Sequence, residues 1–134
     1  MNQRAIQLLK LSFVIGTIAD GLVAVNWYLI AFGFSIPNIM TGYSDSGTGY
    51  EFAMYIAALF MTGWAILLFW GLFKPADRRD LLIITAVLLL ISIILEFLFF
   101  QKLFIMNTFL IGVTLRLLLI GKFSFSYFYS IRNK

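Results

Sequence analysis

Four long apolar runs, separated by short polar connections, constrain this chain more than any other feature of its sequence. They cover approximately residues 11–34, 51–73, 81–100 and 104–120. Each run is close to the roughly 20 residues that a helix needs to cross the hydrocarbon core of a bilayer. Hydrophobic residues make up 62% of the 134 residues and charged residues only 12%, against roughly 25% charged residues in soluble domains. The sequence therefore predicts an all-α, polytopic membrane protein with a bundle of four transmembrane helices.

The connections between the runs have the composition of loops and tight turns. Residues 35–50 are rich in Gly, Ser and Thr and contain Pro37, which favours a loop. The connection 74–80 is short enough to make the second and third helices an antiparallel hairpin, and Asp77 and Asp80 resemble a capping box at the start of the third helix. The tail after residue 120 is expected to continue as an interfacial helix. Residues 1–134 are thus expected to form one membrane domain.

Positively charged residues are distributed unequally between the two ends of the predicted helices. Under a four-helix topology, one side carries Arg4, Lys10, Lys74, Arg78, Arg79, Lys122, Arg132 and Lys134. The opposite side carries Asp45, Glu51 and the single Lys102. The positive-inside rule then predicts a multi-pass protein of the cytoplasmic (inner) membrane with both termini in the cytoplasm. The same distribution assigns the net charge of +4 to membrane anchoring and makes nucleic acid an unexpected partner.

The first run and two tryptophans fit this topology. The run is longer than the apolar region of a signal peptide and is therefore expected to stay as an uncleaved helix. Trp27 and Trp70 fall near opposite ends of their helices, where aromatic belts form at membrane interfaces. We expect both to be anchors rather than ligand contacts.

The absence of Cys and His excludes much chemistry. It removes disulfides, thiolate catalysis, zinc or haem ligation by imidazole, and the commonest proton-transfer base at neutral pH. The sequence contains no phosphate-binding glycine loop, and the 35–50 loop has too few hard ligands around Asp45 for a calcium site. No cofactor, metal site or catalytic residue is predicted.

Asp20 is the one acid inside the first apolar run. It lies about nine residues into the predicted helix, roughly 14 Å from its cytoplasmic end and therefore near mid-membrane. A charge there costs roughly 2.5 to 3.5 kcal/mol on insertion scales, so such acids usually face a partner, a cavity or a substrate path. Ser12, Gly16 and Ala24 share its i, i+4 row, and these small residues predict that this face packs against another helix.

Arg116 is the candidate partner of Asp20. It lies in the fourth helix, and its side chain is expected to lean toward the helix N-terminus and the membrane centre. Two interpretations follow. Either Arg116 and Asp20 form an ion pair, or Arg116 extends to the inner headgroups and leaves Asp20 to protonate, bind a cation or pair with a substrate.

Glu96 is predicted to lie in the outer third of the bilayer, away from Asp20. It shares a helix face with Ser92 and lies at nearly the depth of Asn26 and Asn107, which suggests an outward-opening polar cluster. The alternative is that these groups are hydrogen bonds between helices, with Glu96 reaching Lys102 or the outer interface. The estimated depth difference of roughly 8 Å or more argues against a shared-proton pair of Asp20 and Glu96.

Three resemblances arise from these residues. Asp20, in the middle of the first of four short helices, resembles the small multidrug-resistance exporters, dimers whose membrane-embedded carboxylate exchanges protons for cations. Those exporters use Glu at this point, whereas this chain has Asp. Asp20 and Glu96 in four helices are also similar to a sterol-isomerase-like group that buries carboxylates in a lipid-binding cavity. The segments IADGLVA, GWAILLFW and KPADRRDLLIIT, with Glu96, resemble uncharacterised small four-helix bacterial membrane proteins, over most of the chain and with no implied activity.

The sequence supports three classes of function. The first is a protein of the lipid bilayer that binds or transports a small amphiphilic or cationic ligand, with Asp20, Glu96, Asn26, Asn107 and Arg116 as candidate ligand-binding residues. The second is a structural or accessory subunit with internally paired charges. The third is a lipid-modifying enzyme that uses Asp20 or Glu96 as acid or base. Four helices enclose little space, so transport would require a homo-oligomer.

Overall fold

The computed structural model describes residues 2–133, and the regular structure within them is entirely helical. The long helices are α1 (Gln3–Ala31), α2 (Thr48–Gly71), α3 (Asp80–Phe99) and α4 (Met106–Arg132), with a short 3-10 helix, η1 (Gln101–Leu103), before α4. All four long helices have the length and apolar composition needed to cross a membrane. The predicted all-α fold with four candidate transmembrane helices is confirmed.

Helices α1 and α4 extend furthest beyond the predicted apolar runs. Helix α1 begins at Gln3 rather than at residue 11, because the Oδ1 atom of Asn2 caps it by accepting hydrogen bonds from the backbone N–H groups of Arg4 (2.6 Å) and Ala5 (3.4 Å). Helix α4 continues to Arg132 rather than ending near residue 120, so the helix expected in the tail is confirmed as part of α4. Hydropathy marked the apolar part of each helix and not its ends.

The predicted capping box at the start of α3 is wrong. Arg79 occupies the N-cap position with helical backbone angles, and no side chain caps the helix there. The preceding residues form hydrogen-bonded turns, with Arg78 N–H donating to the Lys74 carbonyl at 3.1 Å. Because these turns run directly into the helix, Asp77 is not at its start. Asp80 lies in the first turn, where its charge is favourable to the helix dipole.

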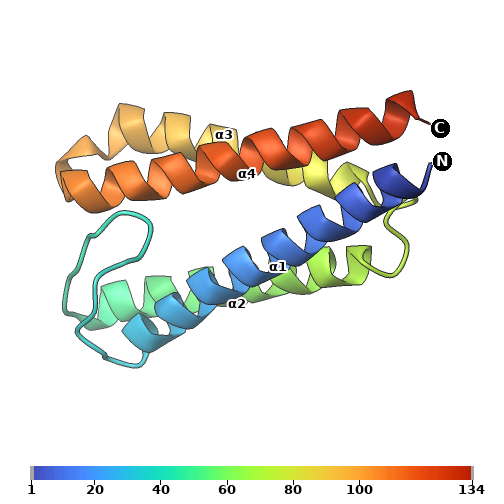
Figure 1. Cartoon of the computed structure of the whole chain (residues 1–134). Helices are drawn as coiled ribbons and strands as arrows, with labels where there is room; N and C mark the ends of the chain where they lie inside the picture. The colour runs from blue at the N-terminus through green and yellow to red at the C-terminus, as the bar shows by residue number, and fades with distance from the viewer. Residues whose placement is uncertain (1, 134) are drawn as a thin grey trace.

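The four helices form two antiparallel pairs (Figure 1). Helices α1 and α2 pack closely together, as do α3 and α4, while α2 and α3 make few contacts. The chain ends lie side by side, with Asn2 N–H donating to the Asn133 carbonyl at 3.3 Å. We call this end of the bundle the termini end and the opposite end, which holds residues 32–47, the loop end.

The main apolar core lies toward the termini end. It is formed by buried side chains from all four long helices: Leu9, Phe13, Leu68, Leu82, Ala86 and Phe123. The predicted small-residue row of α1 faces inward here. The Ser12 hydroxyl is hydrogen-bonded to that of Ser126 in α4 at 2.7 Å, and a Cβ atom at Gly16 would lie 2.9 Å from Leu68 Cδ1. This close packing joins the two helix pairs at one end.

At the loop end, residues 32–47 fold back between the two pairs (Figure 1). Asn26 of α1 holds the loop backbone with two hydrogen bonds, donating from Nδ2 to the Pro37 carbonyl at 3.2 Å and accepting at Oδ1 from Ile39 N–H at 3.0 Å. The Thr41 carbonyl accepts from Ile105 N–H at 3.2 Å, which ties the loop to the start of α4. The loop is therefore bound to both helix pairs.

Candidate functional site

Two cavities lie between the helix pairs and meet at Asp20. The α2/α3 cavity, of about 470 Å³, is bordered chiefly by those helices and by the loop. The α1/α4 cavity, of about 550 Å³, is bordered chiefly by α1 and α4. Asp20, Met40, Met61 and Leu89 line both cavities. The two cavities lie between the core at the termini end and the folded-back loop at the loop end.

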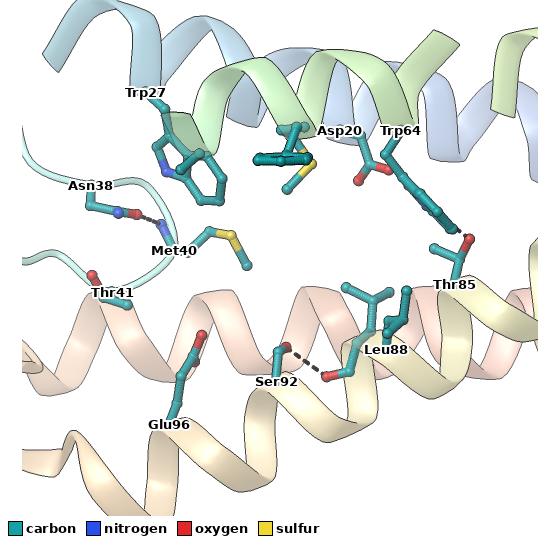
Figure 2. Close-up of a pocket in the computed structure, with 14 residues that line it drawn as sticks. Asp20, Trp27, Asn38, Met40, Thr41, Trp64, Thr85, Leu88, Ser92 and Glu96 are labelled. Carbon is teal, nitrogen blue, oxygen red and sulfur yellow. Dashed lines mark hydrogen bonds between the residues drawn. The ribbon is translucent and has the colours of Figure 1, made fainter. Parts of the chain in front are cut away.

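Asp20 is the charged group common to both cavities. Its side chain and that of Trp64 extend from neighbouring helices into the space between the pairs (Figure 2). Within residues 2–133, no hydrogen bond or ion pair reaches its carboxylate. The Trp64 indole N–H donates instead to Thr85 Oγ1 at 3.1 Å. Asp20 is thus a carboxylate with unused acceptor capacity in a mainly apolar space.

Arg116 forms an ion pair with Glu96, and the predicted pair with Asp20 is wrong. Its Nη2 atom lies 2.8 Å from Glu96 Oε2, with the Arg116 side chain 4% exposed and that of Glu96 23% exposed. Arg116 also donates from Nη1 to Ser92 Oγ at 3.2 Å and from Nε to the Gly112 carbonyl at 3.3 Å. The alternative in which Arg116 extends to headgroups is also wrong, because all three nitrogens bind α3 or α4.

Arg116 pairs with Glu96 because α3 and α4 are neighbouring helices. Helices α3 and α4 are joined only by η1 and a short extended segment, so they lie side by side. The Arg116 side chain leans toward the start of α4, where the end of α3 and Glu96 lie. The direction of the Arg116 side chain was predicted correctly, but the helix that it contacts was not. Glu96 is therefore paired with Arg116 rather than with Lys102, and its carboxylate is not left to solvent.

The predicted cluster of Glu96, Asn26 and Asn107 is not assembled. The Asn26 amide is used by the loop backbone, and Asn107 is exposed in the first turn of α4. Neither lines either cavity. The prediction rested on the similar depth of these residues along their helices. Their side chains point in different directions, so equal depth does not bring them together.

Trp27, which the sequence predicts to be a membrane anchor, lies beside a cavity. It borders the α2/α3 cavity beside Asn38, Met40 and Thr41 of the loop (Figure 2). Its indole Nε1 atom is buried and has no hydrogen-bond partner within the described part of the chain. The i, i+7 spacing of Trp27 from Asp20 could have revealed this position in the sequence, because it places both side chains on one helix face.

The remaining acid of the loop, Asp45, lies outside the cavities. Its carboxylate accepts from the Tyr43 hydroxyl at 3.0 Å and from Ser46 N–H at 2.7 Å. The hydrogen bond to Asp45 raises the pKa of the Tyr43 phenol above its ordinary value. Among residues 2–133, no three acidic side chains gather where they could hold a metal ion.

Comparisons with protein-family models, curated proteins and solved structures return no match to this chain. The resemblances noted in the sequence therefore gain no support from them. The arrangement of Asp20, the two cavities and the Arg116–Glu96 pair is the basis for assigning a function.

Proposed function

We propose that this chain is a multi-pass protein of the cytoplasmic membrane that binds a small cationic amphiphile at Asp20. The four long apolar helices support insertion. The chain ends and the α2–α3 connection, which carry most of the Lys and Arg residues, share the termini end (Figure 1). By the positive-inside rule, this end faces the cytoplasm and the loop end faces the opposite side.

The observation that carries the proposal is the position of Asp20 where the two cavities meet, without a partner among residues 2–133. A carboxylate in an apolar site is stabilised strongly by a cation because the local dielectric constant is low. Apolar side chains of both cavities, including Phe60, Leu88 and Leu115, suit the hydrocarbon part of such a ligand. A cationic amphiphile matches both requirements.

A second candidate is a structural or accessory subunit. It is favoured by the Arg116–Glu96 pair, which is satisfied inside the chain and links α3 to α4. This candidate leaves the unpaired Asp20 without a role, so we rank it second. The third candidate is a lipid-modifying enzyme that uses Asp20 or Glu96 as acid or base. Arg116 already binds Glu96, so Asp20 is the acid that such an enzyme would use, and we rank this candidate last.

Binding of tetraphenylphosphonium, a lipophilic cation, tests the proposal. Calorimetric titration of the protein in lipid nanodiscs should show saturable binding, and Asp20→Asn should weaken it about tenfold or more because a charged partner is lost. Asp45→Asn is the matched control, because Asp45 is an acid outside the cavities. The neutral analogue triphenylphosphine oxide should bind wild type and Asp20→Asn alike.

Equal affinity of wild type and Asp20→Asn for the cation would contradict the proposal. Uptake of the same cation into proteoliposomes under a proton gradient separates transport from binding. Cross-linking in the membrane tests the homo-oligomer that transport would require.

A further inference from the structure

Four charged side chains line the two cavities that meet at Asp20. Asp20 and Glu96 line the α2/α3 cavity, while Asp20, Arg116 and Lys122 line the α1/α4 cavity. Two carboxylates thus border the same connected space as one guanidinium and, at the α1/α4 cavity, one ammonium group. In the structure, Arg116 is bound to Glu96, and Asp20 is the acid left over.

Arg116 is always protonated, and only 3% of the residue is exposed. A buried cation of this kind is strongly stabilised by an opposite charge and strongly destabilised without one. Glu96 supplies that charge at 2.8 Å, while the other two partners, Ser92 Oγ and the Gly112 carbonyl, are neutral. The position of the guanidinium next to α3 therefore depends on the charge of Glu96.

We propose that Glu96 is a positioning residue for the cation site: by holding Arg116, it keeps Asp20 open to a ligand. This inference rests on the proposed function, since it explains how Asp20 stays available. Without the charge of Glu96, Arg116 turns to Asp20, the other carboxylate that borders its cavity. Arg116 then neutralises the charge of Asp20, and its guanidinium repels an incoming cation.

Four variants separate this role from a purely structural one. Glu96→Gln should weaken tetraphenylphosphonium binding by about tenfold or more, because Arg116 replaces the ligand at Asp20. Arg116→Gln should bind at least as well as wild type, because the internal guanidinium no longer competes. The double variant Glu96→Gln/Arg116→Gln should recover binding to within about threefold of wild type. Asp20→Asn should bind weakly in every background.

Labelling with dicyclohexylcarbodiimide gives a readout that does not depend on ligand binding. This apolar reagent modifies protonated carboxyl groups, and an acid paired with arginine stays ionised. Peptide mass spectrometry should show labelling of Asp20 in wild type, reduced labelling in Glu96→Gln and recovered labelling in the double variant. Circular dichroism and size-exclusion chromatography check that each variant is folded.

Unchanged labelling of Asp20 and unchanged cation binding in a folded Glu96→Gln variant would overturn the inference, as would a double variant no better than Glu96→Gln. If Glu96→Gln does not fold, Glu96→Asp replaces it. The shorter carboxylate should hold Arg116 less well and reduce Asp20 labelling, and wild-type labelling would overturn the inference. A wild-type protein that binds no cation but shows the expected labelling pattern would refute the proposed function while supporting the Arg116 exchange.

Discussion

Asp20 and Glu96 are both acids inside apolar helices, and their neighbours give them different roles. Glu96 faces Arg116 across the α3–α4 interface and forms an ion pair with it. Asp20 faces the cavities from α1, and no ion pair reaches it within residues 2–133. Removing one partner of a buried pair typically costs about 3–5 kcal/mol. On this basis we propose that Glu96 holds Arg116 and that Asp20 binds the ligand.

The structural role of Gly112 also depends on the residues next to it, although no charge is involved. A Cβ atom there would lie 2.5 Å from the backbone carbonyl oxygen of Met40, so α4 and the loop approach each other only because position 112 has no side chain. Backbone moves less readily than the end of a flexible side chain. The contact therefore makes this glycine structurally necessary.

Gly112→Ala should lower the free energy of unfolding by about 1–3 kcal/mol, because the added methyl group overlaps the loop backbone. Gly121→Ala on the same helix is the matched control, since nothing lies within 4 Å of its Cβ position. This control should be neutral or stabilising by up to about 1 kcal/mol, through higher helix propensity. Denaturation in mixed detergent micelles measures both, and equal stability of the two variants would contradict the packing described here.

At the scale of elements, the loop between α1 and α2 is a structural part of the site. It contributes Met40 to both cavities and Asn38 and Thr41 to one. Its position depends on the two hydrogen bonds that the Asn26 side chain makes with the loop backbone, one donated and one accepted, and on the bond between Thr41 and Ile105. Since α2 and α3 make few contacts, the loop closes a space that the helices alone leave unfilled.

Asn26→Ala should loosen this loop, because two backbone groups lose their partner. A loss of about 1.4 kcal/mol corresponds to about a tenfold larger open population. The chain has no native cysteine, so Met40→Cys provides a single reporter, and its reaction with N-ethylmaleimide should be faster when Asn26→Ala is present. Asn107→Ala is the control, because Asn107 is exposed. A rate equal in all three backgrounds would show that Asn26 does not hold the loop.

At the scale of the whole molecule, two helix pairs are joined at the termini end and separated by the loop at the other (Figure 1). The apolar core fills the joined end, and the cavities lie in the remaining space. Positive charge is concentrated at the joined end, on the chain ends and the α2–α3 connection. Shape and charge therefore distinguish the two ends, which supports one fixed orientation in the membrane.

Single cysteines test that orientation. Ser44→Cys lies in the exposed part of the loop and Asp77→Cys in the exposed α2–α3 connection, in a chain otherwise free of cysteine. With the termini in the cytoplasm, a membrane-impermeant maleimide should label position 44 in intact cells and position 77 only in inverted vesicles or after permeabilisation. The reverse pattern would refute the orientation, and labelling of both in intact cells would indicate two orientations.

Local patterns predicted the helices better than they predicted the site. The inward-facing row of Ser12 and Gly16 and the direction of the Arg116 side chain were both correct, because helical periodicity fixes which residues share a face. The predicted ion-pair partner of Arg116 was wrong, and the position of Trp27 beside a cavity was not predicted. Both predictions used depth along one helix, which gives the height of a residue but neither its facing direction nor its neighbour.

The sequence by itself determined the all-α fold and the four helices long enough to span a membrane, because run length, hydrophobicity and turn residues are local properties of the chain. Tertiary structure alone decided that Arg116 pairs with Glu96, that Asn26 binds the loop and that Asp20 lies where two cavities meet. These facts depend on which helices are neighbours and how they are rotated. Many weak packing contacts set that arrangement together, and no single segment of sequence contains it.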